Sequence, residues 1–165
     1  SLRGNINTRL KRLDEGRYDA IILASAGLRR MFFNDRITEH LSVTACLPAA
    51  GQGALGIECR AEDENTKALI AGLNHAQTAD CVNAERALCR HLGGGCQVPV
   101  AAFATLEEDT IYLRGLVANQ SGSILLKDEG RAPRAQANQL GIQVAESLIL
   151  QGARAILDSF TPHKG

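Results

Sequence analysis

A cysteine in a glycine-rich segment is the most chemically distinctive residue of this chain. The segment reads HLGGGCQVP over residues 91–99, and its thiol belongs to Cys96. The glycines before it remove side chains that would crowd the sulfur. Arg86, Arg90 and His91 lie close in sequence, and positive charge increases the thiolate fraction of a cysteine. These residues alone leave two interpretations open: an accessible nucleophilic thiol on a roomy loop, or a turn in which the cysteine is incidental.

The other cysteines are expected to be inert thiols. The chain has five in total, at positions 46, 59, 81, 89 and 96. The last three, with His91 between them, have the spacing C-x7-C-x-H-x4-C, which matches no common zinc-ligand pattern, and no metal site is predicted. Cys46 and Cys59 occur in strand-like segments, where we expect them to be buried. An odd cysteine count without any sign of secretion favours free thiols in a reducing cytoplasm.

A second glycine-rich segment, GQGALG at residues 51–56, fits the dinucleotide-binding pattern G-x-G-x-x-G literally. That function requires a preceding strand, a following helix and an acidic residue about 20 positions later. Here Pro48 precedes the glycines, the following residues alternate like a strand, and no acid is suitably placed. We therefore interpret the segment as a flexible crossover between two structural units. Ser25, in the sequence ASAG, lacks the G-x-S-x-G context of a nucleophile elbow.

The composition is that of an ordinary globular protein. The chain has 165 residues, of which 45% are apolar and 22% are charged, and its formal net charge is zero. This charge gives no support for nucleic-acid binding through overall electrostatics. No apolar stretch is long enough to cross a bilayer, and no signal peptide is recognisable. Because the chain opens at Ser1 inside a helix lead-in, we expect it to be a fragment.

The N-terminal elements indicate half of a parallel α/β unit. Helices are predicted over residues 5–15 and 24–33, a buried strand over 18–24, and a second short strand over 41–48. The continuous apolar run YDAIILA is typical of a strand covered on both faces. Helix, strand, helix and strand in this order indicate an α/β half-domain without its partner strands.

The C-terminal elements indicate a small α+β domain that positions the cysteine loop. An amphipathic helix is predicted over residues 78–93, with Thr78 as its N-cap and Gly93 as its stop. A three-stranded antiparallel meander follows, joined by turn-like sequences. Its strands are predicted at 98–106, 111–119 and 123–130. A long helix is predicted to start at Pro133 and to pack on the sheet.

The segment ERALCRHLGGGCQVPVAA, residues 85–102, resembles the cofactor-attachment signature of the porphobilinogen deaminase (hydroxymethylbilane synthase) family. Further segments resemble the same family in the same order, and the similarity covers nearly the whole chain. They are residues 2–10, 18–30, 47–60 and 73–87. The resemblance implies a transferase of porphyrin, tetrapyrrole and heme biosynthesis, which joins four porphobilinogen units into hydroxymethylbilane and releases ammonia each time. It also implies a dipyrromethane cofactor, held by a thioether to Cys96, with Gly95 beside it giving the tether space.

The resemblance also assigns binding roles to three arginines and one glutamine. The family's substrate- and cofactor-binding arginines match Arg3, Arg9 and Arg30. Each pyrrole carries an acetate and a propionate, and guanidinium binds carboxylates bidentately while staying charged at every working pH. Arg3 and Arg9 flank a predicted helix N-terminus, which also favours anions. Gln52 is assigned to the lining of the cleft.

Compared with the family, the chain lacks most of the first of three domains; the first two domains resemble periplasmic binding proteins. Residues 1–47 then correspond to the second half of domain two, 48–73 to a hinge crossover returning to domain one, and 74–165 to the C-terminal α+β domain. The family's aspartate that assists ammonia loss has no counterpart here, so no catalytic residue is predicted, and the chain alone is expected to be inactive. The expected partners are porphobilinogen, the growing polypyrrole chain and the N-terminal part of the same enzyme, which is expected to be monomeric at full length.

Two other functions stay open. A non-catalytic small-anion binding module would suit the α/β half. A cysteine hydrolase or redox thiol would need a base or a resolving cysteine beside Cys96, and the sequence supplies neither of these clearly. A covalent adduct on Cys96 would favour the transferase.

Overall fold

The computed structural model describes residues 2–93 and 98–160 of the chain. By backbone packing the chain divides into two compact units, with the division between residues 42 and 43. Within the described ranges, no helix is both long and apolar enough to span a membrane.

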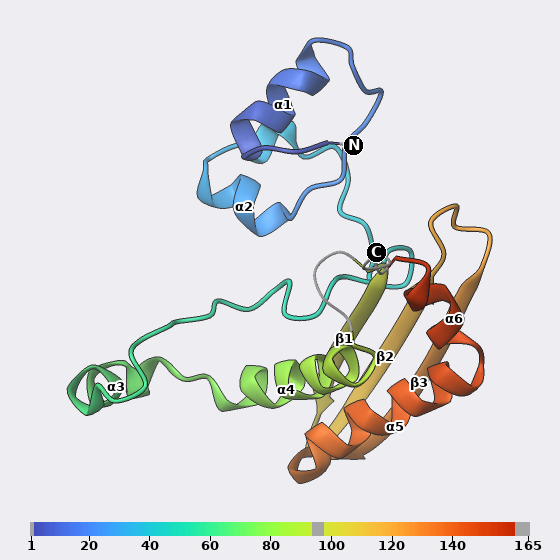
Figure 1. Ribbon diagram of the computed structural model, residues 1–165. Coiled ribbons are helices and arrows are strands. Elements are labelled where there is room, and N and C mark those ends of the chain that lie inside the picture. Colours follow the sequence, from blue (N-terminus) through green and yellow to red (C-terminus); the bar gives the residue numbers. More distant parts are fainter. Residues whose placement is uncertain (1, 94–97, 161–165) are drawn as a thin grey trace, which may run out of the picture. The chain divides into compact units, whose positions relative to one another are not determined.

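The described part of the first unit contains two short α-helices and one turn of 3₁₀-helix (Figure 1). They are α1 (Ile6–Asp14), α2 (Ser25–Arg30) and η1 (Asn34–Arg36). Asn5 caps α1, because its side-chain oxygen accepts the N–H of Thr8 at 2.9 Å. A Cβ placed on Gly27 would lie 2.9 Å from Cδ1 of Ile6, so α2 packs directly against the first turn of α1.

The two strands predicted for this region are absent from the described residues. Residues 18–24 and 41–48 contain no strand, and Ile22 is 73% exposed. A strand is stabilised by hydrogen bonds to a neighbouring strand, and the described part of the first unit offers no second strand for pairing. The strand predictions are therefore wrong here, because the apolar run has no partner on which to form a sheet.

The described part of the second unit contains a three-stranded sheet and four α-helices (Figure 1). Its helices are α3 (Glu64–Ile70), η2 (Ala71–Leu73), α4 (Ala76–His91), η3 (Arg134–Gln136), α5 (Ala137–Leu150) and α6 (Ala153–Asp158). Its strands are β1 (Val100–Glu107), β2 (Thr110–Ala118) and β3 (Leu125–Pro133). This order places the predicted cysteine loop between α4 and β1.

The strands form the predicted antiparallel meander, in the order β1–β2–β3. Glu107 pairs with Thr110 across the first hairpin, whose two-residue turn has Glu108 in the left-handed region at φ 56°. Pro133 pairs with Thr110 at the end of β3. Pro133 therefore ends a strand, contrary to its predicted role as a helix start, and α5 begins at Ala137 after η3.

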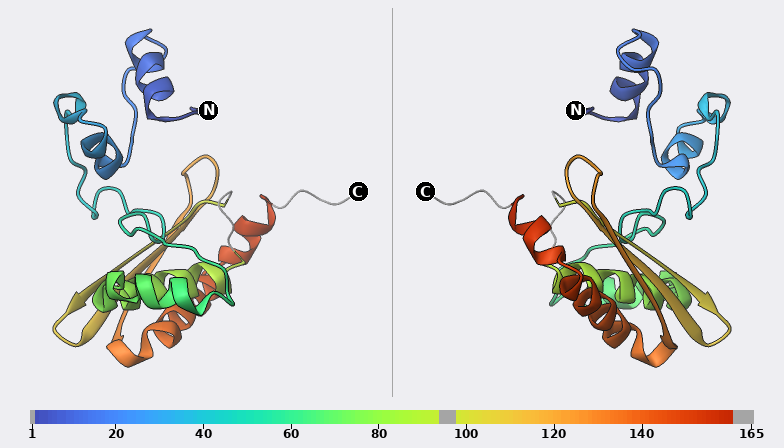
Figure 2. Two further views of the ribbon diagram at one scale, coloured as in Figure 1. Left: turned by 90° about the vertical axis from the view of Figure 1, so that its left-hand side faces the viewer. Right: turned by 90° about the vertical axis from the view of Figure 1, so that its right-hand side faces the viewer.

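Helices α4 and α5 pack side by side on one face of the sheet (Figures 1 and 2). Alternate residues of β2 face them and are completely buried: Ile111, Leu113 and Val117. Leu88 of α4 and Leu148 of α5 are likewise fully buried. Where the helices meet, a Cβ on Gly141 would lie 2.4 Å from the carbonyl oxygen of Ala84, so only glycine permits this close approach.

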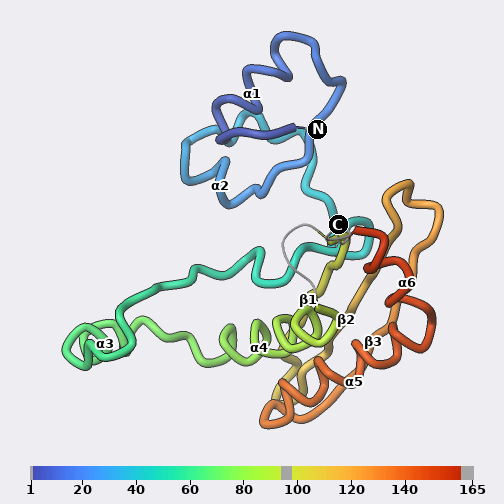
Figure 3. The backbone as a smooth tube through the Cα atoms, viewed as in Figure 1, coloured from blue at the N-terminus to red at the C-terminus, as the bar shows by residue number. Residues whose placement is uncertain are grey.

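An irregular segment, residues 43–63, precedes α3 in the chain (Figure 3). It contains a double turn, residues 49–54. In this double turn the N–H of Gln52 donates to Ala49 O and the N–H of Ala54 donates to Gly51 O, both at 3.0 Å. After these turns Leu55 is 89% exposed. The alternating sequence there forms no strand in the described structure.

Candidate functional site

Cys96 and Gly95 lie outside the described residues, but the segment before them is described. Leu92 follows α4 and is 1% exposed, so its side chain is fixed in the core. Gly93 comes next, with φ at 71°, and its N–H donates to Arg90 O at 3.0 Å. This left-handed glycine confirms the predicted stop of the helix.

The segment after the cysteine joins the sheet immediately. The carbonyl of Pro99 accepts the N–H of Ala118 at 3.0 Å, just before β1 begins. The connection that carries Cys96 is therefore attached at one end to α4 and at the other to the sheet. Arg86 and Arg90, on the last turns of α4, are exposed and form no ion pair with a described residue.

The three predicted arginines all belong to the first unit. Arg9 is half-buried, and its Nε donates to the carbonyl oxygen of Gly4 at 2.8 Å, which leaves its terminal nitrogens free of that bond. Arg3 and Arg30 are exposed. Among the described residues, none of these three guanidinium groups has an acidic partner. By contrast, Arg36 of the same unit is paired with an aspartate.

The first turn of α1 adds backbone donors near Arg3 and Arg9. The N–H groups of a helix's first turn have no partner within the helix, and they carry the positive end of its dipole. Asn5 satisfies the N–H of Thr8. Arg3 precedes this helix start, and Arg9 is the fourth residue of α1 and reaches back to Gly4 O, so the helix start is suited to bind a carboxylate.

Gln52 lies in the double turn that follows Pro48, within the second unit. Gly51, immediately before it, has φ at 70°, a conformation that favours glycine. Gln52 is exposed and lines an open groove of about 380 Å³, together with residues of α4 and β1. They include His75, Thr78, Cys81 and Phe103.

Glu85 fixes this turn to the domain core. Its side chain is 4% exposed, and its two oxygens accept the N–H of Gly51 at 2.7 Å and the N–H of Ala104 at 2.8 Å. Burial raises the pKa of this carboxyl above its ordinary value, and the two backbone hydrogen bonds oppose the rise. In the sequence, Glu85 is recognisable only as part of the family signature. Its position next to Ala84 and three residues before Leu88, on the apolar face of α4, was the signal for burial.

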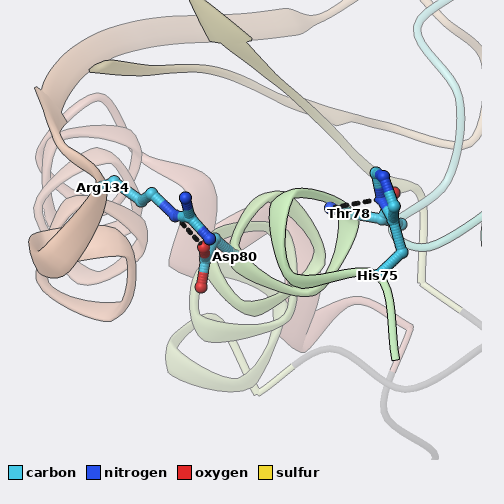
Figure 4. A network of polar contacts seen from close by, with 4 residues as sticks. All are labelled: His75, Thr78, Asp80 and Arg134. Atoms are coloured by element: carbon cyan, nitrogen blue, oxygen red, sulfur yellow. Dashed lines mark hydrogen bonds and ion pairs between the residues drawn. The ribbon is translucent and has the colours of Figure 1, made fainter. Parts of the chain in front are cut away.

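The start of α4 differs from the prediction. His75 caps the helix: its Nδ1 accepts the N–H of Thr78 at 3.3 Å and lies 2.8 Å from the hydroxyl of that residue (Figure 4). Thr78 is therefore inside the first turn, and the predicted cap was wrong by one turn of helix because a histidine side chain accepts the N–H group. Two residues after Thr78, Asp80 forms an ion pair with Arg134 of η3, which ties α4 to the beginning of α5 (Figure 4).

The other cysteines divide into two kinds. Cys81 and Cys89 are half-buried on α4, and burial raises the pKa of each thiol. Cys46 and Cys59 are exposed, so the prediction that both are buried is wrong. Burial there depended on strands that have no partner in the described structure. In residues 2–93 and 98–160, no cluster of histidine, cysteine and acidic side chains is arranged to hold a metal.

Two family models match the chain, one over each part. The first is described as "Porphobilinogen deaminase, dipyromethane cofactor binding domain" and matches residues 1–68. The second is described as "Porphobilinogen deaminase, C-terminal domain" and matches residues 79–150. The chain belongs to the porphobilinogen deaminase family.

The predicted site residues of this porphobilinogen deaminase chain are divided between the two matches. The cofactor-binding match spans the three arginines and Gln52. Dipyrromethane is the cofactor of that domain. The C-terminal match spans α4 from Ala79 onward, the meander and α5, and so includes the connection that carries Cys96. The small helix-covered antiparallel sheet is the fold of this C-terminal domain.

Proposed function

We propose that this chain is part of a transferase that condenses four porphobilinogen units into hydroxymethylbilane and releases one ammonia for each. In this proposal a dipyrromethane cofactor is held by a thioether to Cys96. The observation that carries it is the pair of domain matches, one of them to a dipyrromethane-binding domain. The described residues on either side of Cys96 support it, because Leu92 in the core and Pro99 on the sheet would give a tethered group fixed points of attachment to the domain.

The residues of the first unit fit a dipyrromethane group. Its pyrroles carry acetate and propionate side chains, and such carboxylates are best bound by unpaired guanidinium groups. Arg3, Arg9 and Arg30 have no acidic partner among the described residues, and the first turn of α1 adds backbone donors. We propose a periplasmic-binding-protein-like half-domain for residues 1–47, completed by strands from another part of the enzyme.

In this scheme the chain's own residues bind and orient. The arginines neutralise the carboxylates that accumulate as the product lengthens, and Gln52 lines the cleft. Gly95 leaves room beside the Cys96 sulfur. When bound, dipyrromethane supplies the pyrrole end to which the first porphobilinogen is joined. Because the sulfur is a lasting attachment, Cys96 is a holder and does not turn over with each product.

The substitution Cys96→Ser, made in the enzyme completed with its N-terminal part, tests this proposal. Serine cannot form the thioether, so we expect loss of the covalent adduct from the intact mass and loss of hydroxymethylbilane formation. Cys59→Ser is the matched control, because that thiol is exposed and lies outside the α4–β1 connection; it should keep both adduct and activity. Undiminished turnover by Cys96→Ser would contradict the proposal.

We also propose that the N-terminal part of the enzyme contributes the aspartate that assists ammonia loss, since no residue of this chain matches it. The chain assayed alone is then expected to form no hydroxymethylbilane.

A non-catalytic small-anion binding module is a second candidate function, supported by the same unpaired arginines. It would bind carboxylates without any adduct on Cys96. The cysteines of the described residues are free thiols, and they support a reducing, cytoplasmic location as a further part of this proposal.

A further inference from the structure

Glu85 is a buried carboxylate with no part in the function proposed above. Its two oxygens bind backbone N–H groups from two segments distant in sequence, Gly51 at 2.7 Å and Ala104 at 2.8 Å. No cation pairs with it in the described structure. Burying an unpaired charge is costly unless hydrogen bonds satisfy it. Here both carboxylate oxygens of Glu85 are hydrogen-bonded, and the side chain forms a bridge between the double turn, α4 and β1.

The bridge takes the place of a fourth strand. β1 is an edge strand, and its outward N–H groups need partners where they are covered. The N–H of Ala102 donates to Pro48 O at 3.1 Å, and that of Ala104 donates to Glu85. The segment of Pro48 and the double turn is thus bound to β1 at two places, directly through Pro48 O and at Gly51 through the carboxylate.

The same helix leads from this bridge to the cysteine connection. Glu85 and Leu92 are separated by two turns of α4, about 10 Å along the helix axis. Both side chains are buried in one core, so this part of α4 is fixed against the sheet. On its other side, Gln52 follows directly after Gly51, the residue that Glu85 holds.

We infer that Glu85 is a positioning residue, which holds the double turn, and with it Gln52, at a fixed distance from the C-terminal end of α4, where the connection to Cys96 begins. The inference rests on the proposed function, because it takes Gln52 to line the cleft and Cys96 to hold the cofactor. Glu85 touches neither group and acts through the turn. Its carboxylate is suited to this because both N–H groups need an acceptor. A glutamine would offer one oxygen and would place an N–H₂ group against the other donor.

The test combines amide protection with a double-mutant cycle. In Glu85→Gln one of the two backbone N–H groups loses its acceptor. We therefore expect hydrogen exchange to accelerate at that amide, of Gly51 or of Ala104, while the amide of Leu148 stays protected. In the complete enzyme, kcat/KM for porphobilinogen should fall by about tenfold to a hundredfold, the loss typical of a misplaced binding group. Gln52→Ala should lower it as well. The double variant should be little worse than the poorer single variant, since both changes act on one turn.

Controls separate positioning from folding. Glu62→Gln, at an exposed site of the same unit, should leave exchange and kcat/KM unchanged. If Glu85→Gln does not fold, Glu85→Asp keeps the charge with a shorter reach and enters the same cycle. The inference would be overturned if the two losses in kcat/KM multiply in the double variant, or if kcat/KM stays unchanged although the amide has lost its protection from hydrogen exchange. In either case, a retained Cys96 adduct would leave the proposed function intact. A wild-type enzyme without that adduct would instead overturn the proposed function, and this inference with it.

Discussion

At the scale of single residues, charged side chains of the chain occur in two opposite environments. Glu85 is buried at 4% exposure and is satisfied entirely by backbone N–H groups. Arg3 and Arg30 are exposed and have no acidic partner among the described residues. The first arrangement stabilises the fold, whereas the second leaves charge free for a ligand.

The cysteines provide a residue-scale prediction. Cys46 and Cys59 are exposed, whereas burial shields Cys81 and Cys89 and raises their pKa values, which lowers the reactive thiolate fraction. Iodoacetamide at neutral pH should therefore label the first pair well before the second, as followed by mass spectrometry of peptides over time. Equal labelling rates for Cys59 and Cys89 would contradict the structure.

At the scale of elements, the contact between α4 and α5 depends on a missing side chain. Gly141 faces the backbone of α4 at Ala84, and the Asp80–Arg134 ion pair fixes the same two segments nearby. Because α4 carries Glu85 and leads to the cysteine connection, the packing of these helices determines where that connection starts.

A methyl group at this contact should be costly. Gly141→Ala places a Cβ where 2.4 Å separates it from a backbone oxygen, and we expect a loss of about 1–3 kcal/mol in the free energy of unfolding. Gly72→Ala is the matched control, since nothing lies within 4 Å of its Cβ, and it should change stability little. Urea denaturation of both variants measures the difference. Equal stabilities would show that α5 moves freely away from α4.

Sequence periodicity predicted the meander and the helices that pack on it, because those elements bury their apolar faces against one another. It failed for residues 18–24, where a strand needs partners that the described chain does not supply. Cys96 stood out by its glycine-rich and cationic surroundings, but its predicted role as cofactor holder and the choice of the three arginines came only from the family resemblance. The role of Glu85 was not predictable, because its hydrogen-bond partners lie 34 and 19 residues away in the sequence.

At the scale of the whole molecule, the two units differ in how much core they possess. The first buries few apolar side chains, among them Leu10 and Leu28, whereas the second has a continuous core beneath its sheet. Residues between the double turn and α4 are largely exposed, including Leu55 and Leu69. Local opening is therefore expected first outside the helix-covered sheet.

Limited proteolysis should follow this division. Arg60 has a side chain that is 85% exposed and lies in the irregular segment before α3. Trypsin is expected to cut there early and to leave a resistant product that contains α4, the sheet and α5. Intact mass measured over the digestion identifies the product. A resistant fragment of residues 1–60 with a degraded sheet would contradict the assignment of stability.

The bridge at β1 has a consequence for self-association. Bare sheet borders recruit strands from other molecules, yet this border is already occupied by the chain's own Pro48 and by the Glu85 carboxylate. The opposite border, β3, presents Lys127, Glu129 and Arg131 in alternation and ends in a proline. In the described structure, both edges of the sheet therefore carry features that oppose pairing with a foreign strand, and we expect the domain not to polymerise through its strands.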